Sequence, residues 1–293
     1  MALPDINHQA APAEVELERL SPGQLLAKAL LLNPLANFLP SSITRALLKL
    51  GKSELAQANW ADPGGWKSMV ISYEAKPAML SDRVLINGGT IPMALRNRRK
   101  LGAYLLARLI EQTQVPRVHL LCLGAGPGAI AMDALAQAKK PAYATLVDIS
   151  ADAFDYGLRM ARQRGLEASV RYIKADIREV QAKSYLDSPP HVVKMLGICE
   201  YLNDELLVDV ASATAAMMPD GAPIVLNTIN RTHGTDRFFR RVFGLHMIHR
   251  DCAELAHLMA LAGFGQFTAH TEPLGVYDVL VARKQPQAAK RPG

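Results

Sequence analysis

The sequence is organised around the stretch VHLLCLGAGPGAI, residues 118–130. Its first half is almost entirely apolar, as is typical of a parallel strand buried on both faces. Gly124, Gly126 and Gly128 follow at a spacing of two residues, and glycines in such a turn permit positive φ and let a ligand approach the backbone. The helix that follows points its amide dipoles at the turn. The pattern indicates a nucleotide-binding turn, with an ordinary tight strand-to-helix turn as the alternative.

An acidic residue, Asp148, ends a second apolar run about twenty residues beyond the glycines. A carboxylate at the carboxyl end of the second strand can accept hydrogen bonds from a ribose diol. Together with the Gly-x-Gly-x-Gly spacing, Asp148 resembles motif I and the acidic loop of class I S-adenosylmethionine (SAM) dependent methyltransferases. The resemblance implies SAM as the cofactor. The residues that it implies for cofactor binding are Gly124, Ala125, Gly126, Gly128, Asp148, Ile149, Asp176, Ile177, Leu196 and Gly197.

Two positions in this set concern the adenine ring and its surroundings. In the family, an acidic residue at the place of Asp176 hydrogen-bonds the exocyclic amine of adenine, and its apolar neighbour packs on the ring. A plain helix N-cap is the alternative role for Asp176. One position departs from the family pattern, because many members carry an acidic residue where this chain has Cys122. A thiol carries no comparable charge at neutral pH, so other groups must hold the amino-acid end of the cofactor.

Strands and helices alternate after the glycine turn, as they do in a doubly wound α/β domain. The two last expected strands flank a Pro-Leu-Gly turn, which resembles the antiparallel hairpin that distinguishes the methyltransferase sheet. The resemblance covers residues 115–284. We therefore expect an α/β fold with a doubly wound seven-stranded methyltransferase-type sheet. The seven expected strands cover residues 118–123, 144–149, 169–175, 191–198, 222–229, 266–272 and 277–283.

The chain is expected to divide into a helical N-terminal lid or cap segment, residues 1–114, and a SAM-binding Rossmann-like catalytic domain, residues 115–293. Residues 1–20 show no strong periodicity, which predicts a frayed start that becomes helical near residues 14–20. Capping residues and apolar spacing predict further helices. These cover residues 21–32, 41–50 and 91–112.

The segment of residues 59–91 is predicted to be irregular, and it holds both tryptophans of the chain. It is either a lid over the cofactor or a connector whose aromatic side chains pack under the helices. Most of the basic run at residues 96–100 is expected to be a solvated helix face. After the fifth expected strand, the polar insertion of residues 230–249 is expected to shape the acceptor pocket.

Residues 196–201 follow the fourth expected strand, where open α/β sheets place their ligands. Tyr201 is our first catalytic candidate, because its ring could face the sulfonium and its phenol could orient a nucleophile. Tyr172 is the second, and His233 and His246 are further candidates. For each of them a structural role is the alternative, since no motif places it near the methyl carbon.

Three functions are compatible with these residues. The first is a methyltransferase acting on a small molecule, in which the protein supplies proximity and alignment. The second is a SAM cyclase or lyase that uses the aminocarboxypropyl group, as azetidine-2-carboxylate synthases and nicotianamine synthases do on a similar core; the change at Cys122 suits it. The third is a SAM-binding protein without catalysis.

Composition limits the remaining classes. The net charge of +6 comes largely from local clusters, so nucleic-acid binding is not expected. The three cysteines are widely spaced in apolar sequence, which favours reduced, packed thiols over disulfides or a metal site. The apolar run of residues 25–32 is too short to span a bilayer, and no signal peptide is expected. We expect a cytoplasmic protein without a membrane partner, with a homodimer as an open alternative.

Overall fold

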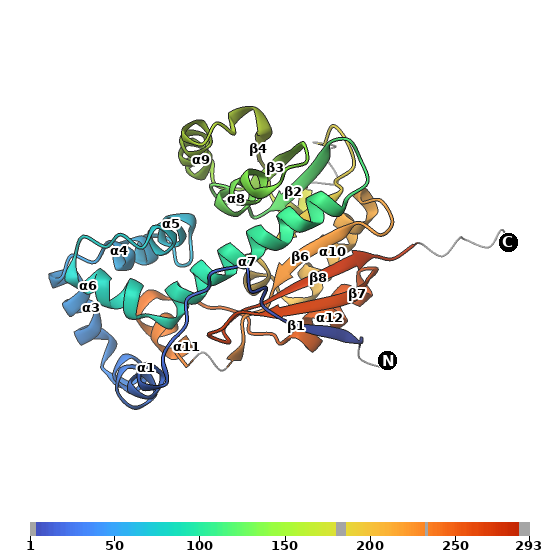
Figure 1. The fold of residues 1–293 in the computed structure, drawn as a ribbon. Helices are drawn as coiled ribbons and strands as arrows, with labels where there is room; N and C mark the ends of the chain where they lie inside the picture. Colours follow the sequence, from blue (N-terminus) through green and yellow to red (C-terminus); the bar gives the residue numbers. More distant parts are fainter. Residues whose placement is uncertain (1–3, 180–185, 232–233, 287–293) are drawn as a thin grey trace.

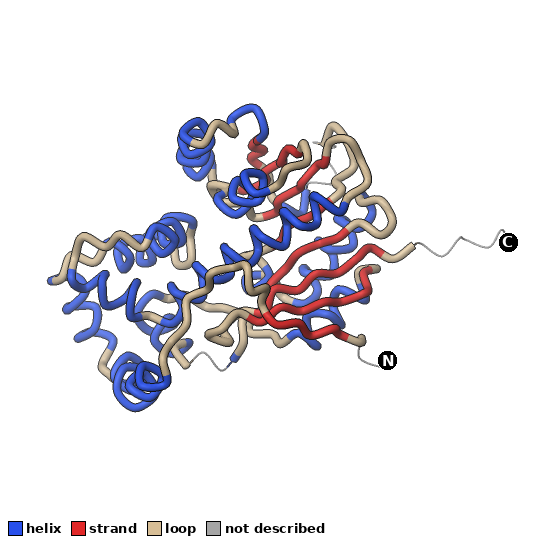
Figure 2. The backbone as a smooth tube through the Cα atoms, in the orientation of Figure 1, coloured by secondary structure: helices blue, strands red, loops and turns tan. Residues whose placement is uncertain are grey.

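One eight-stranded mixed sheet forms the centre of the protein, in the order β1-β7-β8-β6-β5-β2-β3-β4. The computed structural model describes residues 4–179, 186–231 and 234–286 (Figures 1 and 2). Strands β6, β5, β2, β3 and β4 are parallel, whereas β8 is antiparallel to both of its neighbours. The α/β methyltransferase-type class is thereby confirmed. The strands are β1 (Ile6–Ala10), β2 (Val118–Leu123), β3 (Ala142–Asp148), β4 (Val170–Lys174), β5 (Val192–Met195), β6 (Pro223–Asn227), β7 (Phe264–Thr271) and β8 (Asp278–Lys284).

The eighth strand, β1, was not predicted. It pairs in parallel with β7, with Ile6 opposite Phe267, so the expectation of a frayed start was wrong. No helix forms at residues 14–20 either, because Glu18 is held in an irregular segment by Asn97 and Arg96 of a later helix. Both features depend on partners that lie far away in the sequence, and a local pattern does not reveal such partners.

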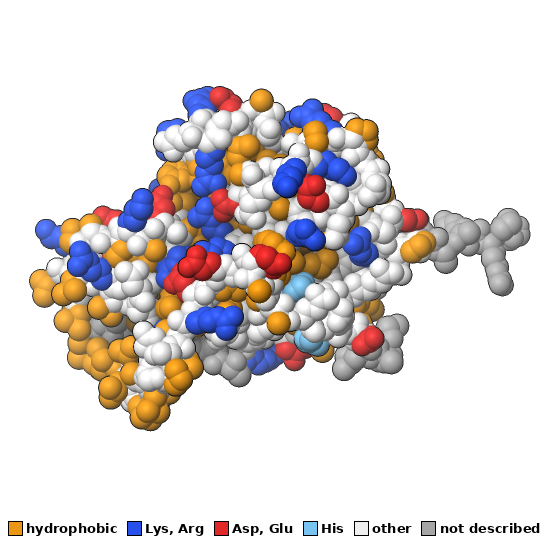
Figure 3. Space-filling view, viewed as in Figure 1, with side chains coloured by type: hydrophobic (Ala, Val, Ile, Leu, Met, Phe, Trp, Pro, Cys, Tyr) orange, Lys and Arg blue, Asp and Glu red, His pale blue; other side chains and the backbone are white. Residues whose placement is uncertain are grey.

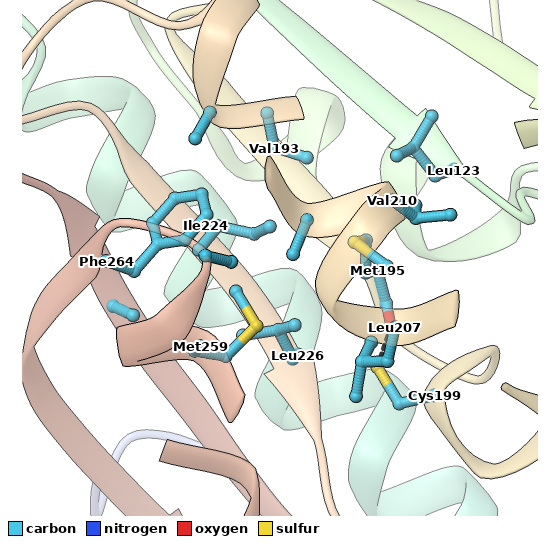
Figure 4. Packing of buried hydrophobic residues seen from close by; sticks show 14 of the residues in the cluster. Leu123, Val193, Met195, Cys199, Leu207, Val210, Ile224, Leu226, Met259 and Phe264 are labelled. Carbon is cyan, nitrogen blue, oxygen red and sulfur yellow. Dashed lines mark hydrogen bonds between the residues drawn. The ribbon is translucent and has the colours of Figure 1, made fainter. Parts of the chain in front are cut away.

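Helices cover both faces of the sheet. The long helix α7 (Thr90–Gln112) and α8 (Ala129–Gln137) pack on one face, where Leu101 and Leu120 are fully buried. On the other face, α10 (Asp204–Met217) and α12 (Cys252–Leu261) enclose the second core with Met195 and Met259 (Figure 4). Helix α9 (Ala151–Gln163) flanks β4. Short 3-10 turns cover Glu167–Ser169, Ile177–Glu179 and Cys199–Tyr201.

The N-terminal segment forms a second group of helices beside the sheet (Figure 1). The expected helix of residues 21–32 runs on through a π-helical stretch to residue 38, since Pro34 falls in the first turn of the next piece, where proline is tolerated. Residues 59–91, expected to be irregular, are largely helical. The elements are α1 (Pro22–Ala27), the π-helical Lys28–Leu32, α2 (Asn33–Phe38), α3 (Ser41–Leu50), α4 (Glu54–Ala61), α5 (Trp66–Glu74), α6 (Leu80–Asp82) and the π-helical Arg83–Asn87.

The insertion after β6 packs against these N-terminal helices. It contains α11 (Asp236–Phe238) and the π-helical Phe239–Phe243. The carbonyl oxygen of Val242 accepts hydrogen bonds from the side chains of Arg45 and Trp60. A third apolar core, which includes Phe243, joins the insertion to α3, α4 and the start of α7. The insertion thus fixes the N-terminal helices beside the carboxyl ends of the strands.

Candidate active site

A cavity of about 620 Å³ lies at the carboxyl ends of β2, β3 and β5. Its walls come from the glycine turn, from the loops after β3, β4 and β5, and from helix α5. All ten residues that the resemblance implied for cofactor binding line this cavity, so the fold brings them together from four separate loops. Of the two catalytic candidates, Tyr201 lines the cavity, and Tyr172 is not among the lining residues.

The glycine turn has the conformation that its sequence predicts. Gly124, Gly126 and Gly128 have φ values of 59°, 53° and 84°, a region that other residues rarely adopt. At Gly128 a Cβ atom would lie 2.5 Å from Leu146 Cδ1 of β3, so the turn packs tightly on the sheet. At Gly126 the nearest atom to a Cβ would be Trp66 Cβ at 3.6 Å, which leaves this backbone open toward the cavity.

The two predicted acidic residues have different surroundings. Asp148 Oδ2 accepts a hydrogen bond from Gly126 N (2.7 Å), and Oδ1 accepts one from Ser150 N (2.9 Å). Each carboxylate oxygen keeps acceptor capacity for a ligand, because an ionised carboxylate has about four lone-pair sites. Asp176 forms an ion pair with Arg178, which also lines the cavity. Asp148 therefore both braces the glycine turn and faces the cavity.

The position where the family has an acidic residue is neutral in this chain. Cys122 is fully buried, and this desolvation raises the pKa of its thiol to about 12. Opposite it on β5 stands Lys194, which also lines the cavity. Lys194 Nζ donates to the carbonyl oxygen of Gly124 at 3.3 Å, and burial lowers the pKa of its ammonium group. This end of the cavity is therefore built around a buried amine instead of a carboxylate.

A second buried cation, Arg98 of α7, lies at the same end. Its guanidinium pairs with Glu200 at 2.9 Å and stacks on the ring of Tyr277, with 4.6 Å from Cζ to the ring centroid. The side chains of Arg98 and Glu200 are only 1% and 4% exposed. Asn227 links Glu200 to the loop after β5, because it donates to Glu200 Oε2 and accepts from Gly197 N. Arg98 thus positions the cavity floor.

The location of Arg98 corrects our expectation that most of the basic run of residues 96–100 is a solvated face. Arg96 and Arg98 are buried, and Arg99 pairs with Asp133 of α8. Helix α7 is covered on most of its sides, and its first three arginines have acidic partners: Arg96 pairs with Glu18, Arg98 with Glu200 and Arg99 with Asp133. Neither Arg98 nor Lys194 was predicted as a site residue. The sequence did contain a signal for Lys194, because a lone lysine within the apolar run HVVKMLGI of residues 191–198 indicates a buried charge.

Helix α5 closes one side of the cavity. Trp66, Met69, Val70 and Tyr73 face the cavity from this helix. The ring of Trp66 lies 5.4 Å from the ring of Tyr156 on α9, centroid to centroid, and the Tyr156 hydroxyl donates to Glu74 Oε1 at 2.7 Å. The segment around the two tryptophans therefore reaches across to the sheet domain and covers the glycine turn.

The aromatic candidates differ in what their hydroxyls do. The Tyr201 hydroxyl lies against Gly64, so that a side chain there would collide with it. Tyr201 is 41% exposed as a whole residue, and desolvation of its phenol, followed by the Glu200 carboxylate, raises the pKa of that phenol above its ordinary value. The Tyr172 hydroxyl instead donates to the carbonyl oxygen of Pro127 at 2.9 Å. Tyr172 supports the glycine turn and is not among the residues that line the cavity, and its catalytic role stays a prediction.

The remaining candidates lie elsewhere. His246 is exposed and is not among the residues that line the cavity, and His233 lies outside the described residues. The expectation that residues 230–249 shape the main pocket also needs correction. Among its described residues, none lines the 620 Å³ cavity; Phe239, Leu245 and Met247 line a smaller one of about 60 Å³ behind Arg98.

A comparison with known protein families shows which family this chain belongs to. Residues 89–284 match the model of a family described as "Putative methyltransferase". The chain belongs to this family. The match covers well over half of the sequence, and it begins at α7 instead of at the glycine strand. The predicted membership of the class I methyltransferase superfamily is thereby confirmed.

Solved structures share the fold at low sequence identity. Magnesium protoporphyrin IX methyltransferase from Synechocystis, solved with bound SAH, is 12% identical and aligns over 84% of this chain and 99% of its own with a TM-score of 0.56. N,N-8-amino-8-demethyl-D-riboflavin dimethyltransferase from Streptomyces davawensis is 16% identical over 78% and 71%, with a TM-score of 0.53. An O-methyltransferase family protein from Burkholderia thailandensis is 13% identical over 71% and 63%, with a TM-score of 0.51.

Two further findings complete the comparison. No curated protein matches this sequence significantly. Within residues 4–179, 186–231 and 234–286, none of the helices has the length and apolar character needed to cross a membrane.

Proposed function

We propose that this family member is a SAM-dependent methyltransferase that acts on a small molecule. The observation that carries the proposal is that all ten residues of the implied cofactor site line one cavity of about 620 Å³. That volume lies within the range of about 300–1,000 Å³ that is usual for cofactor and small-molecule sites. The family match and the SAH-bound structure with the same fold agree with it. Helix α5 covers the cavity, which favours a small acceptor over a macromolecular one.

The residues present fit the adenosine part of SAM. The open backbone at Gly126 allows a ligand to approach the turn closely, and Asp148 offers acceptor sites to the ribose hydroxyls. Ile149 lines the cavity although it is 69% exposed, so it offers an apolar surface to a base. Asp176 and Ile177 line the same cavity from the next loop, and we assign them to adenine as the family resemblance implies.

In our proposal, the methionine part of SAM lies at the end of the cavity that contains the buried cations Lys194 and Arg98. We assign the cofactor carboxylate to Lys194, because its buried ammonium group, which donates to the carbonyl oxygen of Gly124, gains from an anionic partner. The neutral Cys122 thiol leaves the cofactor amine without the usual carboxylate. Bound SAM supplies the electrophilic methyl group, and the protein aligns the acceptor and excludes water. Tyr201, which lines the cavity, is our candidate for the hydroxyl that orients an acceptor.

The cofactor assignment is tested by Asp148→Ala, with Asp152→Ala as the matched control. Asp152 is an exposed carboxylate in the first turn of α9, and it is absent from the cavity lining. Asp148→Ala should weaken SAM binding by about 1.5–3 kcal/mol, the range for a charge-assisted hydrogen bond. Asp152→Ala should bind SAM as the parent does. Isothermal titration calorimetry measures both, and a folded Asp148→Ala protein with parental affinity, or a parent that prefers NAD, would contradict the assignment.

A second candidate function is intramolecular ring closure of SAM. It is favoured by the neutral Cys122, which stands where many family members have an acidic residue. The cofactor amine lacks a carboxylate partner at Cys122, and Lys194 lies opposite Cys122 on β5 and lines the same cavity. Product analysis by mass spectrometry separates the candidates. S-adenosylhomocysteine formed only with an added acceptor supports methyl transfer. Methylthioadenosine formed from SAM alone supports ring closure, and tight binding without turnover under any acceptor supports a non-catalytic role.

A further inference from the structure

The helical stretch of residues 22–38 exposes its large apolar side chains and buries a lysine. Its large apolar side chains point to solvent, with exposed fractions from 45% for Leu32 to 69% for Phe38. The one buried residue that the structure records in this stretch is Lys28, whose Nζ donates to Thr90 Oγ1 at 3.0 Å. A surface helix normally buries its apolar face and exposes its lysines. This stretch therefore leaves its apolar face uncovered in the single chain.

Neighbouring elements extend the same surface. Exposed apolar side chains continue on α3, on α6 and on the π-helical segment that follows α6. Figure 3 shows these side chains as a broad hydrophobic area over the N-terminal helices at the lower left. We call this area the leucine surface. Its residues are Leu25, Leu26, Leu30, Leu31, Leu32, Leu35, Phe38, Ile43, Leu47, Leu50, Leu80 and Val84. A contiguous apolar area of this extent marks an interaction site.

The charge beside the leucine surface is mainly positive, with Glu54 as an exposed acidic residue next to it in the sequence. Residues 21–53 contain four basic residues and no Asp or Glu. Lys49 and Lys52 are exposed beside Leu50, and Arg237 of α11 lies over the ring of Phe38 at 5.1 Å from its centroid. Asp82, the acidic residue within α6, is buried and accepts hydrogen bonds from Ser53 Oγ and Glu54 N. The apolar area is thus bordered by exposed cations.

We propose that the leucine surface docks on a membrane whose headgroups are anionic. Leucine and phenylalanine side chains would enter the boundary between headgroups and acyl chains, while Lys49, Lys52 and Arg237 would contact the headgroups. A second copy of the chain fits less well, because a self-complementary contact would bring like-charged borders together. The sequence led us to expect no membrane partner because no segment is long enough to span; docking on one leaflet needs no spanning helix.

Vesicle co-sedimentation of the full chain tests the proposal. Phosphatidylcholine vesicles that contain phosphatidylglycerol should carry the parent into the pellet, and vesicles of phosphatidylcholine alone should carry much less. The triple variant Leu31→Ser, Leu35→Ser, Phe38→Ser should lose at least about tenfold in vesicle affinity, since apolar burial supplies the anchoring. Lys49→Gln with Lys52→Gln should bind more weakly and with a smaller salt dependence. Leu261→Ser, at an exposed leucine of α12, is the matched control and should bind as the parent does.

Several outcomes would overturn the proposal. They are a parent that stays in the supernatant with both kinds of vesicle, equal binding to charged and uncharged vesicles, and a triple variant that binds like the parent. Analytical ultracentrifugation addresses the competing occupant. A parental dimer that the triple variant dissociates, without any vesicle binding by the parent, would assign the leucine surface to an interface between copies. Circular dichroism and thermal unfolding establish beforehand that each variant is folded.

Discussion

At the scale of single residues, Cys122 and Lys194 determine the charge at one end of the cavity. The two residues lie opposite each other on β2 and β5 and face the side of the sheet covered by α7. A carboxylate at the first position would hold an ammonium group, whereas a buried ammonium group at the second holds a carboxylate. Under the proposed function, this pair makes the carboxylate of SAM, instead of its amine, the end that the site binds most strongly.

Lys194→Met tests this exchange, with Lys174→Met on exposed β4 as the control. SAM affinity should fall by about 1.5–3 kcal/mol in Lys194→Met, because the cofactor carboxylate loses a charged hydrogen-bond donor. Stability should not fall, since an apolar side chain of similar length replaces a buried charge. Lys174→Met should change neither quantity. Unchanged SAM affinity in a folded Lys194→Met protein would remove Lys194 from the cofactor site.

The lowered pKa of Lys194 adds a pH dependence with a defined sign. The unfolded chain has the ordinary lysine value of 10.5, so between the lowered pKa and 10.5 the unfolded state binds more protons, and stability from this group rises with pH. Any stability advantage of Lys194→Met at pH 7 should therefore shrink as pH rises through this window. SAM affinity of the parent should fall over the same range relative to the variant, since the cofactor's own amine titrates in both. Parallel affinity profiles would contradict a charged Lys194 in the complex.

Some site residues could be read from the sequence and others could not, for a physical reason. The glycines and Asp148 lie on loops whose place in an open α/β sheet follows from strand order alone. Arg98 stands on a helix 102 residues before its partner Glu200, and its burial depends on packing that no local pattern contains. The direction of the Tyr172 side chain is hidden for the same reason: Tyr172 lies on the predicted strand, but its hydroxyl donates to the carbonyl oxygen of Pro127.

At the scale of elements, the fit between α9 and the glycine turn holds the cavity wall in place. Gly157 lies within α9, and a Cβ atom there would be 2.5 Å from the carbonyl oxygen of Pro127 and would also meet the Tyr172 hydroxyl. The absence of a side chain lets the helix approach the turn closely. The prediction that residues 59–91 are irregular was wrong at this scale. Their glycines and prolines suggested loops, but these residues lie at the ends of short helices, as Gly65 does before α5.

Gly157→Ala should destabilise the protein by about 1–3 kcal/mol, because α9 must move away from the turn to accommodate a methyl group. The matched control is Gly23→Ala in α1, where nothing lies within 4 Å of the added Cβ. That variant should be stabilised by about 0.4–1 kcal/mol through the reduced entropy of the unfolded chain. Urea unfolding measures the free energy of unfolding of both variants, provided that its dependence on urea concentration stays the same. Equal effects of the two substitutions would show that α9 is not closely docked on the turn.

At the scale of the whole molecule, α7 joins the two groups of elements that the sequence analysis had separated at residue 114. Its first half packs with the N-terminal helices and the insertion after β6, and its second half covers the sheet (Figure 1). Leu101, Leu106 and Ile110 are completely buried in the core that also contains Leu120 of β2. The family match, which begins at residue 89, includes this helix. The boundary at residue 114 remains a prediction about function, but it cuts through the packed core.

Two truncations therefore should behave differently. A chain that begins at Val115 loses α7 and exposes one face of β2, so it should show no cooperative thermal transition and should aggregate. A chain that begins at residue 11 loses only β1, of whose residues Ile6 alone is half-buried and the rest are exposed. It should still unfold cooperatively, with a midpoint lowered by roughly 2–4 °C for each kcal/mol lost at the sheet edge. Scanning calorimetry distinguishes these results. Cooperative unfolding of the chain that begins at Val115 would show that the sheet with its remaining helices is an independent domain, and that α7 serves to attach the N-terminal helices to it.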